Sequence, residues 1–251
     1  MTGFDVQVWA AAAFAAVFAG ISKGGFGSNA AFAGAAILAL IVPPGAALAI
    51  MLPLLLAIDA ATLRPYWRQW HGRDAALLIV GGIPGVALGA ALFRLVEADV
   101  FRLLIGAIAL AFVGWQLLVR GGLAPRPAGR LGSKAGVVAG ALAGFTSFVS
   151  HAGGPAAAVF LLGRGLGKTA FQASTVLVFG VLNVVKVGVY AGLGLFTPQT
   201  LAMNAVLLPC ALIGAWLGVK AHCRVPERVF FAVTYVLLTV TGAKLIHDGL
   251  T

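Results

Sequence analysis

The chain has 251 residues, of which 61% are hydrophobic and 10% are charged, and these values exclude an ordinary water-soluble domain. The formal net charge of +10 does not indicate a nucleic-acid-binding protein, because Lys and Arg occur in short clusters between apolar runs, as in the loops of membrane proteins. The composition predicts an all-α integral membrane protein that lies in a lipid bilayer and has no nucleic-acid partner.

Apolar segments recur along the whole chain, many of them near the roughly 17 to 25 residues that a helix needs to cross a bilayer. The first is interpreted as mature protein rather than a signal peptide, because Asp5 and no Lys or Arg precedes it. The segments fall at 6–20, 28–42, 45–63, 75–93, 100–119, 134–149, 155–163, 169–191, 199–219 and 229–246.

Two pairs of short segments are separated by polar, glycine-rich breaks, "GISKGGFGS" and "SHAGGP". Lys and Arg cluster in the connections at 64–73, 120–134, 164–168 and 220–228, which we therefore place in the cytoplasm. The segments 6–42 and 134–163 must then each enter and leave the bilayer on one side, from opposite faces. Each is expected to form a broken, re-entrant helical hairpin followed by three transmembrane helices.

This arrangement predicts two inverted repeats, which are typical of transporters. Residues 1–120 form the first repeat, 121–133 a cytoplasmic linker and 134–251 the second repeat, with both termini on the periplasmic side. The halves also resemble each other: "IPGVALGA" matches "LPCALIGA", and an offset of 124 pairs Asp59 with Asn183, Thr62 with Lys186 and Tyr66 with Tyr190.

The two hairpin tips are expected to meet near the midplane and form a substrate site, because irregular backbone is tolerated there only when protein or water covers it. Glycines let backbone N–H groups approach a ligand, and half-helices beginning near Ser28 and Pro155 would direct positive dipole ends inward. The predicted substrate-binding residues are Ser22, Lys23, Gly24, Gly25, Ser28, Asn29, Ser147, His151, Gly153, Gly154, Asn183 and Lys186.

Several of these residues have a second interpretation. Lys23 and Lys186 could extend to the membrane surface, and the glycines could serve close helix packing. His151 is either a proton carrier or a hydrogen-bond donor, and Asp59 either takes part in proton coupling or pairs with Arg64 or another cation. Asn183, Lys186 and Tyr190 are spaced to share one helix face.

Two lysines against one aspartate make the predicted interior positive, so the expected ligand is an anion. Neither a cofactor nor a metal is predicted. Cys210 and Cys223 are about 20 Å apart on one predicted helix, which excludes a disulfide between them.

The chain resembles the TauE/SafE sulfite exporter family, also called the toluene sulfonate uptake permeases. The resemblance rests on "AGISKGGFG" and "LPLLLAID" in the first half, and on "GFTSFVSHAGGPAAAVFLLGRGL" and "FGVLNVVKVGVYAGLGL" in the second. It implies a carrier for sulfite, sulfonates or related organosulfur anions in the bacterial cytoplasmic membrane. It also singles out Lys23, His151, Asn183 and Lys186.

We therefore expect a secondary transporter that works by alternating access around the midplane site. Export is favoured, since a negative interior assists the exit of a monoanion by about 2.3 kcal/mol per 100 mV. The alternatives are a passive anion channel or uniporter of the same architecture, an intramembrane enzyme and a pigment with Lys186 as a Schiff base. The enzyme is disfavoured because paired carboxylates and HExxH are absent from the sequence. A homodimer is left open.

Overall fold

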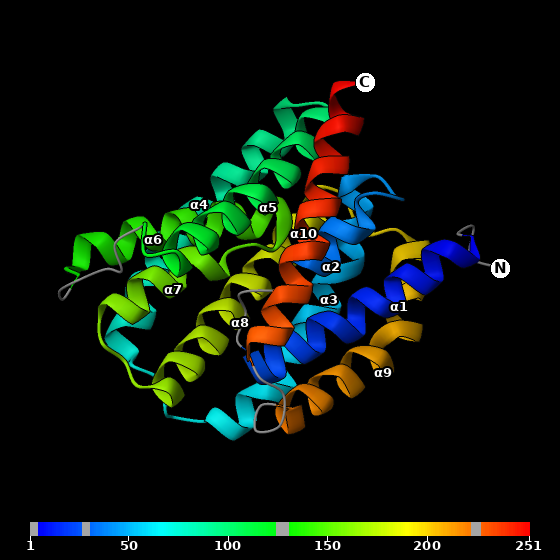
Figure 1. Cartoon of the computed structure of the whole chain (residues 1–251). Coiled ribbons are helices and arrows are strands. Elements are labelled where there is room, and N and C mark those ends of the chain that lie inside the picture. The colour runs from blue at the N-terminus through cyan, green and yellow to red at the C-terminus, as the bar shows by residue number, and fades with distance from the viewer. Residues whose placement is uncertain (1–4, 27–30, 124–130, 222–226) are drawn as a thin grey trace.

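Helices joined by turns and short irregular segments, with no strand, make up the part of the chain that the computed structural model describes, residues 5–26, 31–123, 131–221 and 227–251 (Figure 1). The helices of the first half are α1 (Val6–Ile21), a π-helix η1 (Ser22–Phe26), α2 (Ala33–Leu38), α3 (Pro44–Leu63), a 3-10 turn η2 (Arg64–Tyr66), α4 (Gly72–Leu95) and α5 (Ala98–Arg120). Those of the second half are α6 (Ser133–Ser150), α7 (Gly154–Gly163), α8 (Lys168–Gly192), α9 (Pro198–Ala221) and α10 (Glu227–Leu250).

Six helical stretches of the described chain are long and apolar enough to cross a membrane. They are Val6–Gly25, Pro44–Tyr66, Gly72–Leu95, Ala98–Arg120, Thr169–Gly192 and Pro198–Lys220, and α7 is a shorter apolar helix. Length and composition thus agree with the predicted all-α integral membrane protein.

The first break differs from the prediction. The helix continues through Lys23 as the π-helix η1, so that Val6–Gly25 is one stretch of 20 residues. A π-helix carries an extra residue in a turn and keeps most backbone groups paired, which a bilayer requires. The return arm is short, because α2 has only six residues and a turn leads from it to Pro43 and Pro44, which begin α3.

Each of the main helix pairs joins a helix of the first half to a helix of the second half. α1 runs along α9 and α4 along α6, while α5 contacts α10 and α3 contacts α8 (Figure 1). Two halves related by a twofold axis would pack in this way, with α1 equivalent to α6, α3 to α8 and α4 to α9. The inversion of the second half across a membrane remains a prediction.

Close approach of α4 and α6 depends on glycine. A Cβ atom added to Gly144 would lie 2.8 Å from the Cα of Gly82, and one added to Gly85 would lie 2.9 Å from the nitrogen of Phe145. Small residues allow such backbone contact, which gives membrane helices their van der Waals packing. The arm that begins the second hairpin is therefore fixed to α4.

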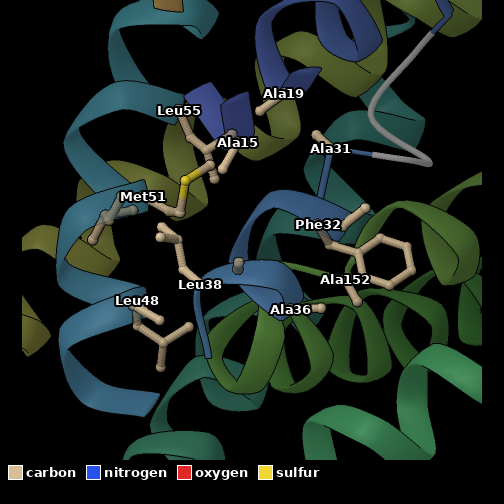
Figure 2. Packing of buried hydrophobic residues seen from close by; sticks show 14 of the residues in the cluster. Ala15, Ala19, Ala31, Phe32, Ala36, Leu38, Leu48, Met51, Leu55 and Ala152 are labelled. Carbon is tan, nitrogen blue, oxygen red and sulfur yellow. The ribbon is translucent and has the colours of Figure 1, made fainter. Parts of the chain in front are cut away.

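The return arm of the first hairpin is buried in an apolar cluster between α1 and α3. Figure 2 shows the side chains of Leu48, Met51 and Leu55 on α3 turned toward Leu38 of α2 and Ala15 of α1. All five side chains are at most 3% exposed, so α2 is held as part of the protein core.

We predict that Gly144→Leu will destabilise the protein, because overpacking of this kind costs about 1–3 kcal/mol or more. The matched control is Gly114→Leu on α5, where nothing lies within 4 Å of an added Cβ atom. Thermal unfolding in detergent measures the difference. Equal melting temperatures for the two variants would contradict the proposed α4–α6 contact.

Candidate functional site

A small cavity lined by buried side chains lies where the two broken segments meet α3 and α8. Its volume is about 10 Å³, which is close to the space that one water molecule requires. The first segment contributes Lys23 and Ala31, and the second contributes Ser147, His151 and Gly154. Leu55 of α3 and Phe179 and Asn183 of α8 complete the lining. The structure thus brings both predicted tips to one place.

Lys23 forms an ion pair with Asp59 of α3, and each side chain is only 3% exposed. The partner of Asp59 is therefore the lysine of the first tip, rather than Arg64 at the end of its own helix. Because a buried charge is stable only beside a partner, this contact holds η1 against α3. The backbone carbonyl of Lys23 also accepts a hydrogen bond of 3.0 Å from the Gln172 side chain of α8.

Asn183 joins the same group from α8. Its amide donates to Oδ2 of Asp59 at 2.7 Å, while the other carboxylate oxygen, Oδ1, faces Lys23. These two residues occupy matching positions of the predicted repeats, and their side chains touch where α3 packs on α8. Asp59 is thereby held from two sides.

Lys186 is completely buried one helical turn further along α8. Its ammonium group donates to the carbonyl of Ser147 at 3.0 Å, to Oγ of Ser147 at 2.9 Å and to Nδ1 of His151 at 2.8 Å. Three acceptors match the three hydrogens of an ammonium. The prediction that Asn183, Lys186 and Tyr190 share a face is confirmed, because all three are buried and bind groups on α3 or α6.

The hydrogen bonds of His151 assign its tautomer. Nδ1 accepts from Lys186, so Nε2 carries the hydrogen and donates to the carbonyl of Leu48 at 3.3 Å. A second proton on Nδ1 would be directed at the Lys186 ammonium. In this arrangement His151 is a neutral imidazole that connects α3 to α8.

Pro53 inside α3 leaves one backbone carbonyl without its helical partner. Proline has no N–H and its ring displaces the carbonyl four residues earlier, here Ala49. The Asn204 side chain of α9 donates to that carbonyl at 3.3 Å, and His151 uses the neighbouring carbonyl of Leu48. Asn204 thus satisfies the carbonyl that the proline leaves free, and His151, directly after α6, adds a contact to the next carbonyl.

The end of α6 presents only one of its three hydroxyl groups to the cavity. Thr146 and Ser150 donate to carbonyls of their own helix, as Ser and Thr often do, which leaves Ser147 to Lys186. His151 then adopts a left-handed conformation with φ of 56°, which is uncommon for a residue with a side chain. From this turn the imidazole reaches both Lys186 and the carbonyl of Leu48.

Other predicted site residues lie elsewhere. Gly24 and Gly25 pack against the backbone of α9, where an added Cβ atom would approach the carbonyl carbons of Ala215 and Gly218, respectively, at 3.2 and 2.9 Å. Their observed contact is close helix packing. Gly153 is similarly tight, with Phe179 Cε1 at 2.6 Å from an added Cβ atom. Ser22 is buried but does not line the cavity.

Ser28 and Asn29 lie outside the described residues, as does Cys223. The half-helix expected to begin near Ser28 begins at Ala33 in the structure, and the one expected near Pro155 begins at Gly154. Only the second of these helices, α7, has its first residue in the cavity wall.

Sequence reasoning missed Gln172 and the carbonyl of Leu48. Gln172 lies in the first turns of α8, and a single glutamine near a helix end carries no recognisable signal.

Sequence reasoning also missed a polar cluster away from the cavity wall, in which Arg164 donates to Asp74 at 3.0 Å and to the Leu131 carbonyl at 3.0 Å. His71 contacts the same carboxylate at 2.9 Å. This cluster ties the end of α7 to the start of α4.

The buried ionisable groups of the site include more basic than acidic side chains. Lys23 and Lys186 face one carboxylate, Asp59, since the other Asp and Glu residues of the sequence lie at helix ends or in the first or last turn of a helix. His151 in its assigned tautomer adds no charge. A polar site with this excess of basic groups, lined by two broken segments, is suited to hold an anion.

A family model described as "Sulfite exporter TauE/SafE" matches residues 12–245, nearly the whole chain. No curated protein and no solved structure matches it. The matched range contains every residue of the cavity wall.

We predict that the ion pair behaves as a unit in stability measurements. Lys23→Met or Asp59→Leu alone leaves one buried charge without its partner and should cost about 3–5 kcal/mol, whereas the double variant should lose much less than the sum. Unfolding of all four proteins in detergent gives the coupling free energy. Strictly additive losses would show that the two side chains do not interact.

Proposed function

Because the chain belongs to the TauE/SafE sulfite exporter family, we propose that it is a secondary transporter for a small sulfur-containing anion such as sulfite or a sulfonate. The family is one of membrane transporters, not of enzymes. The proposed route crosses the bacterial cytoplasmic membrane, and the proposed direction is export, which rests on the family description.

The observation that carries this proposal is the buried pair of lysines beside a cavity between the two broken segments. The side chains of Lys23 and Lys186 are only 3% and 0% exposed. Burying two ammonium groups is costly, so a protein keeps them where they bind something negative. The sulfur oxyanions and sulfonates are compact anions with several acceptor oxygens.

Within the proposed site, Lys23 and Lys186 attract the anion and Asn183 and Ser147 orient it. Gly154 at the beginning of α7 adds a backbone N–H group and the positive end of a helix dipole. His151 keeps Lys186 in position through its contact with Nδ1.

The small volume of the cavity supports a carrier over a passive channel. An oxyanion with three or four oxygens is several times larger than the single water molecule for which the cavity has room. The substrate can therefore enter only if the surrounding elements move apart, as in alternating access. The tight glycine contacts between α4 and α6 and between α1 and α9 define the packed units that would move relative to each other.

The placement of both termini in the periplasm, the cytoplasmic linker 121–133 and the inverted arrangement of the repeats belong to this proposal. A homodimer is also compatible with it. The proposed partners are the anion and the surrounding lipid.

The test is transport in proteoliposomes loaded with radiolabelled sulfite, sulfonate or thiosulfate. The double variant Lys23→Met/Asp59→Asn removes the charge pair without leaving an unpaired charge and should reduce flux to the level of empty liposomes. Lys220→Met is the matched control, since Lys220 is exposed and its ammonium lies 3.6 Å from the Trp216 ring centroid.

Wild-type flux in the double variant would contradict the role of Lys23. Single-channel currents, or turnover above about 10⁵ per second, would favour the passive channel instead, because a carrier that must change conformation in each cycle works on the microsecond-to-second scale.

A further inference from the structure

We propose that Asp59 competes with the substrate for Lys23. In the unloaded site the Asp59 carboxylate pairs with the Lys23 ammonium, and when the anion binds, Asp59 moves away as a neutral carboxylic acid. Binding of one monoanion would therefore take up one proton. This inference rests on the proposed function, since it assumes that the anion binds at Lys23.

The Asp59 carboxylate already occupies the position in which an anion would bind. Its Oδ1 pairs with the Lys23 ammonium, and its Oδ2 accepts from the Asn183 amide at 2.7 Å. These two donors are the ones that an oxyanion entering the adjacent cavity would use, because both line that cavity. With room for about one water molecule beside them, substrate and carboxylate cannot both occupy the position.

Asp59 has space into which its side chain can move. A groove of about 340 Å³ lies between α3 and α8 and has Asp59 in its wall. The rest of its lining is apolar and includes Leu56, Ala60, Val176 and Val184. Gly180 lies in the same wall, and a Cβ atom added there would lie 4.0 Å from Cβ of Asp59, so a larger side chain at this position would occupy groove space next to Asp59.

The chemistry of this groove decides the charge of the displaced group. A carboxylate in an apolar, lipid-facing groove loses its hydration and its partner together, whereas a protonated carboxyl group loses far less. A proton from water therefore bonds to the Asp59 carboxylate as its contact with Lys23 breaks. The substrate anion then replaces one negative charge with another, so the net charge of the site is the same before and after loading.

Few other titratable groups lie where they could take up this proton. Lys23 of η1 and Lys186 of α8 face Asp59, and His151 lies beyond Lys186 with Nδ1 already accepting a hydrogen bond. Helices α1 and α2 contain no Asp, Glu, Lys, Arg or His. The remaining elements against α3 contribute Arg64 and Tyr66 of η2, Asp99, Arg102 and Arg120 near the ends of α5, and Cys210 and Lys220 of α9.

The test uses methanesulfonate, which is a monoanion throughout the range from about pH 5.5 to 8, so that any pH dependence comes from the protein. Equilibrium binding to the purified wild type should weaken about tenfold for each pH unit, which is the linkage expected for uptake of one proton. Asp59→Asn should bind more tightly above pH 7 and change less than about twofold over the whole range. His151→Asn should keep the wild-type slope.

A second variant tests the movement and keeps Asp59 in place. Gly180→Val fills the groove beside the carboxyl group and should weaken methanesulfonate binding by at least about tenfold. Gly188→Val, two turns further along α8, is the matched control, because nothing lies within 4 Å of an added Cβ atom there. It should bind as the wild type does.

The outcomes separate this inference from the proposed function. Two results overturn the inference alone. One is that wild type and Asp59→Asn bind methanesulfonate with the same pH dependence, and the other is that Gly180→Val binds it as tightly as wild type does. Failure of both wild type and Asp59→Asn to bind methanesulfonate, sulfite or thiosulfate overturns the proposed function, and this inference with it.

Discussion

An ammonium group inside a membrane protein requires an anionic or strongly polar partner, and the ion pair between Lys23 and Asp59 meets that requirement. The pair joins the end of the first broken segment to α3. Asn183 extends it to α8, whose Lys186 binds Ser147 and His151 at the end of α6. Four elements from both halves of the chain therefore meet through one connected set of polar contacts, and the cavity lies inside that set.

The surrounding structure supports these contacts by close packing. Glycines let α4 and α6, and α1 and α9, approach at backbone distance, so each broken segment is fixed to a helix of the other half. Pro53 leaves the carbonyl of Ala49 without its helical partner, and Asn204 binds there, while His151 binds the neighbouring carbonyl of Leu48. A movement of one packed unit against the other would necessarily break the Lys23–Asp59 or Lys186–Ser147 contacts, and a bound anion could compensate for that loss.

Much of this architecture could be predicted from the sequence, because helix lengths and the 3.6-residue period depend on local composition. The shared face of Asn183, Lys186 and Tyr190 followed from such reasoning. The polar, glycine-rich breaks in the sequence also marked Lys23 and His151, which lie in the wall of one cavity. The partner of Asp59 could not be predicted in this way, because periodicity shows which residues share a helix face but not which other helix that face contacts. The orientation of Gly24 and Gly25 toward α9 was missed for the same reason, and the hydrogen bond of Gln172 to Lys23 depends on a tertiary contact that has no local signal.

The central claim is that a sulfur oxyanion binds at Lys23 in exchange for Asp59. A crystal structure with selenite, the selenium analogue of sulfite, tests it most directly, because the anomalous signal of selenium locates the anion independently of the protein atoms. The account predicts a selenium peak between the two broken segments, with a selenite oxygen in hydrogen-bond contact with the Lys23 ammonium and the Asp59 side chain turned toward Gly180. A selenium peak elsewhere, or a peak at this site with Asp59 still paired to Lys23, would contradict it.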